Sequence, residues 1–144
     1  MSEVAGGSPD RAGRRKRLVA LCLSLPEAKA EVAGATHLAF KVRNKIFGYY
    51  CNSHHGDGVI ALWCKGAPGE QGRLVSEHPD RYFVPPYVGA RGWVALRLDK
   101  RADDWTGVKD LLLGSYYLTA PDALRRDIGR AAKRTAVRRR RTTR

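Results

Sequence analysis

Long apolar segments are absent from this sequence of 144 residues. No apolar run approaches the roughly 18 residues that a membrane-spanning helix requires, so we expect no membrane partner. The first residues, MSEVAGGSP, show no apolar stretch and cleavage site of the secretory type.

Cysteine is scarce too, and Cys22, Cys51 and Cys64 cannot all pair with one another. Reduced thiols fit this count, so we expect a cytoplasmic protein.

Recognisable catalytic and metal-binding motifs are also missing. Cys51, His54, His55 and Cys64 do not have the spacing of zinc ligands, and the two cysteines stand in or beside apolar strands. No nucleophile-and-base pattern or pair of carboxylates stands out either. We therefore expect no metal, no cofactor and no enzymatic activity.

Acidic residues are few compared with basic ones. The chain has 27 Lys and Arg against 14 Asp and Glu, a net charge of +13. Eight of the basic residues and no acidic residue lie in 130–144, which leaves a net charge of +5 for residues 1–129. A basic tail without an apolar face favours a polyanion, and nucleic acid before a membrane surface. The alternative is a solvated end without a partner.

The chain divides into three parts. Residues 1–9 are small and polar, and we expect them to be disordered. Residues 10–133 have enough apolar residues for one domain with a single core, and residues 134–144 form a basic tail that we also expect to be disordered.

The pattern of apolar residues predicts an α+β domain. A helix begins at Asp10 and ends at Pro26, and residues 26–35 read as a connector. Strands are expected over 36–42, 45–51, 59–65 and 92–98, with 59–65 central because it is apolar on both faces. Helices are expected over 70–77, over 105–119 and from Pro121 onward.

We expect four or five antiparallel strands, with the N-terminal helix and two C-terminal helices packed on one face. The expected core residues are Phe40, Trp63, Trp93, Leu111, Leu112 and Tyr116.

The stretch PPYVGARGWVALRL (85–98) predicts a stiff turn that leads Trp93 into a strand. The two prolines cannot donate hydrogen bonds to a sheet, and the glycines permit backbone angles that other residues avoid. Its glycine spacing is neither a dinucleotide fingerprint nor a phosphate loop. We interpret this stretch as structural.

Four segments together resemble the MmcQ/YjbR family of small bacterial proteins: HLAFKVRNKIFGYY, ALWCK, HPDRYFVPPYVGARGWVALRLD and WTGVKDLLLGSYYLTAP. The resemblance covers roughly residues 14–128. It implies a CyaY-like fold, also described as a double-wing arrangement, and DNA binding. The CyaY-like fold includes frataxin-type iron binders with an acidic ridge, but the first helix here is basic, so we do not expect an iron site.

Three groups of basic residues are candidates for nucleic-acid binding. The wing consists of Lys41, Arg43 and Lys45 at the tip of a hairpin, and an ordinary solvated turn is its alternative interpretation. The collar consists of Arg14, Arg15 and Arg17 in the first helix. The tail supplies Arg138, Arg139, Arg140 and Arg141. The leading hypothesis is non-specific binding of nucleic acid through phosphates, with DNA as the expected partner. The alternative is a non-enzymatic adaptor for a protein or a small ligand.

Overall fold

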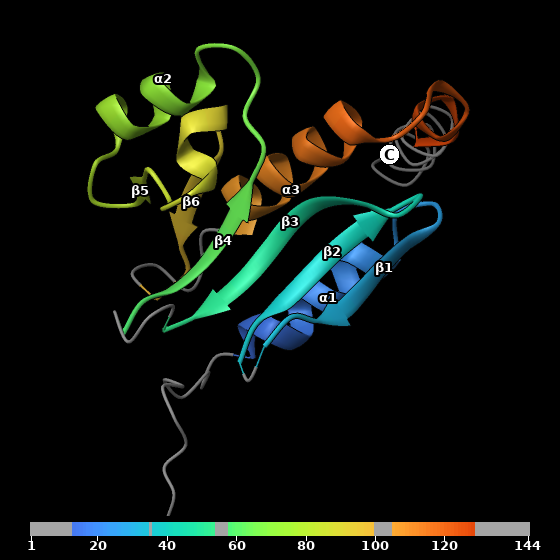
Figure 1. Ribbon diagram of the computed structural model, residues 1–144, viewed down its shortest axis with the longest axis horizontal. Helices are drawn as coiled ribbons and strands as arrows, with labels where there is room; N and C mark the ends of the chain where they lie inside the picture. The colour runs from blue at the N-terminus through green and yellow to red at the C-terminus, as the bar shows by residue number, and fades with distance from the viewer. Residues whose placement is uncertain (1–12, 35, 54–57, 100–104, 129–144) are drawn as a thin grey trace, which may run out of the picture.

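The computed structural model describes residues 13–34, 36–53, 58–99 and 105–128. Six strands form one antiparallel sheet in the order β1-β2-β3-β4-β6-β5. The strands are β1 (Ala28–Val32), β2 (Leu38–Val42), β3 (Lys45–Asn52), β4 (Ile60–Cys64), β5 (Tyr82–Phe83) and β6 (Val94–Arg97). The helices are α1 (Arg14–Leu23), α2 (Glu70–Glu77), the short 3-10 helix η2 (Val88–Arg91) and α3 (Trp105–Thr119), and residues 122–128 are helical as well. Figure 1 shows this arrangement.

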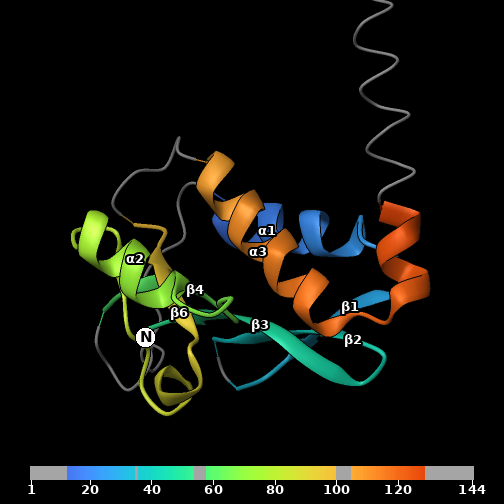
Figure 2. The same ribbon diagram turned by 90° about the horizontal axis from the view of Figure 1, so that it is seen from above.

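The main core lies between the sheet and helices α1 and α3, which cover the same face of the sheet (Figure 2). Phe40, Leu111, Leu112 and Tyr116 are buried in this core, as expected. The last described helical segment adds Leu124 and Ile128 to the same core. The α+β class, the antiparallel sheet and the placement of the terminal helices are therefore confirmed.

The β2–β3 hairpin forms as its sequence predicts. Arg43 and Asn44 both have positive φ, 50° and 65°, which is the backbone of a two-residue type I′ turn. Phe47 is an extra residue in β3, because Phe40 pairs with Gly48 and Lys41 pairs with Ile46. This bulge turns Phe47 into the core, where it is completely buried.

Three details of the sequence interpretation are wrong. Residues 26–35 are not a connector, since β1 occupies 28–32 at the edge of the sheet. The two-residue β5 was also missed, so the sheet has six strands and not four or five. Helix α1 begins at Arg14, after Gly13 in a left-handed conformation, and not at Asp10. For β1 and β5, pairing with a neighbouring strand decides the structure, and the local sequence carries little signal.

A second, smaller cluster covers part of the sheet face that lies opposite α1 and α3. Trp63 and Trp93 are buried there, at 5% and 6% exposure, together with Cys51, Ala61 and Ala95. Residues 93–98 thus alternate between the two faces, because Val94, Leu96 and Leu98 belong to the main core. Among the described helices, none is long and apolar enough to span a membrane.

Candidate nucleic-acid interface

The wing at the β2–β3 hairpin is partly neutralised by acidic neighbours. Arg43 binds the carboxylate of Glu27 with two nitrogens, and the Nη2–Oε2 distance is 2.9 Å. Lys41 Nζ lies 2.9 Å from Glu31 Oε1. These hydrogen bonds from Arg43 hold the pKa of Glu27 below its ordinary value, and the positive charges of Arg43 and Lys29 act in the same direction. Two of the three wing cations are therefore engaged within the protein.

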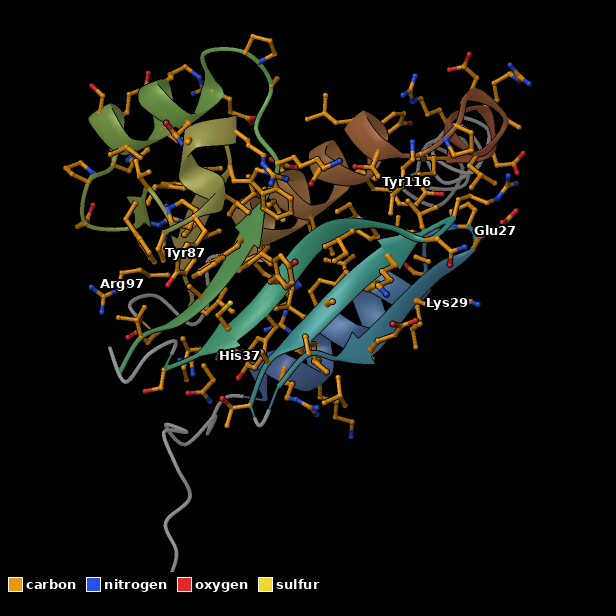
Figure 3. The ribbon with its side chains drawn as sticks, viewed as in Figure 1. Glu27, Lys29, His37, Tyr87, Arg97 and Tyr116 are labelled. Atoms are coloured by element: carbon orange, nitrogen blue, oxygen red, sulfur yellow. The ribbon has the colours of Figure 1, made fainter. Side chains whose placement is uncertain are left out.

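Glu27 is held beside the hairpin by a buried tyrosine. The Tyr116 hydroxyl donates a hydrogen bond to the Pro26 carbonyl over 2.7 Å, which fixes the chain immediately before Glu27. Figure 3 shows Glu27 at one end of the sheet, on the same side as Tyr116, and His37 at the other end of β2. A contact with the core thus fixes the backbone next to Glu27, while the ion pair of Glu27 with Arg43 itself lies on the surface.

Lys45, the third wing residue, contributes to an open pocket of about 620 Å³ that we call the basic pocket. Its lining residues come from the hairpin, the end of β4, η2, the start of β6 and the end of α3. They are Asn44, Lys45, Ile46, Tyr49, Lys65, Gly66, Val88, Arg91, Trp93 and Leu118. Three of them are cationic and none is acidic.

The three cations of the basic pocket influence one another. The pKa of Lys65 is lowered, first by burial of the side chain and then by the positive charges of Lys45 and Arg91. Within the described parts of the chain, none of the three forms an ion pair with a carboxylate. The pocket lining therefore carries three positive charges without a carboxylate ion pair among the described residues, unlike the rest of the wing.

A rigid turn places Arg91 and Trp93 at the pocket. Tyr87 has φ 65° and ψ −65°, and the Val88 amide donates to the Pro86 carbonyl over 2.7 Å, which closes a strained γ-turn. Gln71 Nε2 in α2 donates to the carbonyls of Gly89 and Trp93 over 2.8 and 2.6 Å. The stretch interpreted as structural does form a stiff turn, and it also contributes two residues to the pocket.

A buried serine fixes Lys65 on the opposite wall. Ser115 of α3 accepts a hydrogen bond from the Lys65 amide over 2.9 Å and donates one to the Phe47 carbonyl. A side chain at Gly66 would place its Cβ 2.7 Å from the Gly92 carbonyl oxygen, so only glycine allows the chain to pass so close to the turn. The two walls are thereby held against each other.

The collar lies far from the basic pocket. The Arg17 guanidinium stacks over Trp105 at the start of α3, with 4.0 Å between the guanidinium carbon and the ring centroid. Leu118, which lines the basic pocket, stands 13 residues later on the same helix. That spacing corresponds to about 20 Å along a helix. Arg14 and Arg15 precede Arg17 in α1, so the fold does not bring the collar and the pocket together.

The remaining candidates are accounted for as follows. Arg138, Arg139, Arg140 and Arg141 lie outside the described residues, as do His54 and His55. Cys22, Cys51 and Cys64 are buried and form no disulfide, and burial raises the pKa of Cys22 to about 12. In the described ranges, no group of three or more His, Cys, Asp and Glu side chains is placed to hold a metal.

The sequence interpretation missed Tyr49, Lys65, Arg91 and Trp93 as candidate site residues. Lys65 directly follows a continuous apolar strand, and Arg91 is the single cation of a glycine-rich turn. A cation at the end of a buried strand is a usable signal, but only the pairing of β4 with β3 and β6 joins these positions to Lys45.

Two comparisons with known proteins find a match. The sequence model of the YjbR family matches residues 23–118. A crystal structure of the Deinococcus radiodurans protein DR2400, with a DUF419 domain, is similar in fold, with a TM-score of 0.63 and 22% sequence identity. The similarity covers 80% of this chain and 87% of that protein. No curated protein matches the chain.

Proposed function

The chain belongs to the YjbR family. From this premise we propose that it binds nucleic acid, with DNA as the preferred partner, through phosphate contacts and without sequence specificity. The observation that carries the proposal is the basic pocket, where Lys45, Lys65 and Arg91 stand together without an acidic residue. Contacts from cationic side chains to phosphates supply most of non-specific affinity. The proposal includes a cytoplasmic location and a role in binding rather than catalysis.

The charge distribution outside the pocket supports the same function. Residues 130–144 carry eight basic residues and no acidic one, so the tail can supply additional contacts to phosphates. Arg43 and Lys41 already have carboxylate partners, and Arg17 stacks on Trp105. We therefore assign the main contacts to the pocket and the tail, and a smaller role to the collar and to Lys41 and Arg43 of the wing.

A non-enzymatic small-ligand adaptor is the second candidate. It is favoured by the apolar side chains of Ile46, Val88 and Leu118, which line the same pocket and offer nothing to a phosphate backbone.

Fluorescence anisotropy with labelled DNA at about 50 mM salt tests the proposal, because phosphate contacts are strongest at low salt. Truncation after Lys133 removes six arginines of the tail. Five of them, Arg138 to Arg141 and Arg144, are the expected phosphate contacts, and each contact adds about 0.9 to the slope of log affinity against log salt on duplex DNA. Truncation should therefore lower this slope by up to about 4.5 and leave the thermal midpoint nearly unchanged. No measurable affinity of the full-length chain for DNA or RNA would overturn the proposal and favour the adaptor.

A further inference from the structure

The charge of the basic pocket exceeds what an internal phosphate of a nucleic acid supplies. Lys45, Lys65 and Arg91 bring three positive charges to one pocket without an acidic lining residue. A backbone phosphodiester carries a single negative charge, whereas a phosphate monoester carries about −1.5 to −2 near neutral pH. A monoester therefore compensates the pocket more completely than a diester.

The rest of the pocket lining is apolar or aromatic. Ile46, Tyr49, Val88 and Leu118 line it beside the cations, and Leu118 is 45% exposed on the surface of α3. Inorganic phosphate would leave these side chains in contact with water. An aromatic ring attached to the phosphate would cover them, and a nucleobase can stack on a tyrosine such as Tyr49.

From these observations we propose that the basic pocket binds a phosphate monoester carried by a nucleoside. The ligand is either a free mononucleotide or the phosphorylated end of a DNA or RNA strand, and the second source rests on the proposed function. The pocket volume of about 620 Å³ lies within the range of small-molecule sites.

The position of each cation supports this assignment. Lys45 begins β3, Lys65 follows β4 and Arg91 ends η2, so one phosphate would be held from three separate elements. The γ-turn at Tyr87, the hydrogen bonds of Gln71 and the close approach of Gly66 to Gly92 hold η2 next to the end of β4 before a ligand binds. The hydrogen bonds of Ser115 to Phe47 and Lys65 join β3 to the end of β4. A preorganised site loses less free energy on binding than one that must be ordered.

The electrostatic environment of Lys65 favours the binding of an anion. Its lowered pKa means that the folded protein holds the Lys65 proton less tightly than the unfolded chain does. The charged form therefore destabilises the fold at every pH below the lowered pKa, and this penalty declines as the pH rises from the lowered pKa to the ordinary pKa of lysine. A bound phosphate would remove part of the penalty and raise the pKa of Lys65.

The test uses the full-length chain and a single-stranded DNA labelled at its 3′ end. The strand has about 12 nucleotides, which lies within the usual range of single-strand binding sites. The strand carries either a 5′ phosphate or a 5′ hydroxyl, and adenosine monophosphate and adenosine are compared as competitors. We expect the phosphorylated strand to bind about tenfold more tightly, because one charge-assisted contact contributes about that much. The monophosphate should compete, and adenosine should not.

Two charge-matched variants separate the pocket from net charge. Lys65→Gln with Arg91→Gln should abolish the preference for the 5′ phosphate, whereas Lys29→Gln with Lys109→Gln should retain it. Lys29 and Lys109 are exposed, and neither lines the basic pocket. If the first variant fails to fold, saturation of the wild-type chain by adenosine monophosphate, followed by amide shifts at Lys65 and Arg91, decides the question.

The outcomes separate this inference from the proposed function. Equal binding of both strands without any effect of the monophosphate would overturn the pocket assignment and leave nucleic-acid binding intact. Binding of the monophosphate without binding of any strand would support the pocket and overturn the proposed function. Equal competition by adenosine would overturn the role of the phosphate.

Discussion

Release of the wing cations from their acidic partners should strengthen nucleic-acid binding. Glu27→Gln frees Arg43, and Glu31→Gln frees Lys41, both at the hairpin next to the basic pocket. Two additional phosphate contacts steepen the slope of log affinity against log salt by about 1.8 on duplex DNA. The ratio of the affinities at about 50 and 200 mM salt should then rise about 12-fold.

The assay is anisotropy of labelled duplex DNA with the full-length double variant over this salt range. The matched control is Glu77→Gln with Asp122→Asn, which raises the net charge equally and frees Arg73 and Arg125, neither of which belongs to the wing or lines the basic pocket. The thermal midpoint should change little in both variants, because exposed ion pairs stabilise proteins weakly. An unchanged slope in the wing variant, or an equal increase in the control, would refute the reasoning.

Three further predictions concern the folded domain. In a carbon-detected NMR titration, the Glu27 carboxyl should show a pKa below its ordinary value, and Arg43→Gln should bring this pKa back toward the ordinary value. The pairing should therefore persist at neutral pH and be lost as the pH falls through the lowered pKa. An unshifted pKa of Glu27 in the wild type would contradict this prediction. Cys22, with a pKa of about 12 and no exposed surface, should resist a thiol reagent at pH 8 until the protein unfolds, and rapid labelling of the native protein would contradict its burial. Ser115→Ala should lower the free energy of unfolding by about 1–3 kcal/mol in urea titrations, because the Phe47 carbonyl and the Lys65 amide lose their hydrogen-bond partner. An unchanged urea midpoint would contradict this role of Ser115.

Local patterns predicted the elements whose own residues determine them. Arg43 and Asn44 adopt the positive φ of a tight hairpin turn, and the continuous apolar run of β4 lies between β3 and β6. Helix α2 occupies residues 70–77 as its spacing predicts. Strand β1 was missed because AKAEV has little intrinsic preference for a strand and forms one by pairing with β2.

The candidate site was only partly predictable, for a physical reason. Glu27 and Arg43 are 16 residues apart, and no local pattern reveals that the core places them side by side. The basic pocket combines the hairpin, the end of β4, η2 and α3, so its charge appears only after the sheet has formed. Lys45 was identified from the hairpin sequence, whereas Lys65 and Arg91 required the strand order.

An NMR titration of the ¹⁵N-labelled full-length chain with a 5′-phosphorylated DNA strand tests the central claim most directly. At about 50 mM salt, where phosphate contacts are strong, the amide signals of Lys45, Lys65 and Arg91 should shift together with those of residues 138–141. The signals of Arg14, Arg15 and Arg17 should move much less. Shifts confined to α1, or no shift at the basic pocket while the strand is bound, would contradict the account.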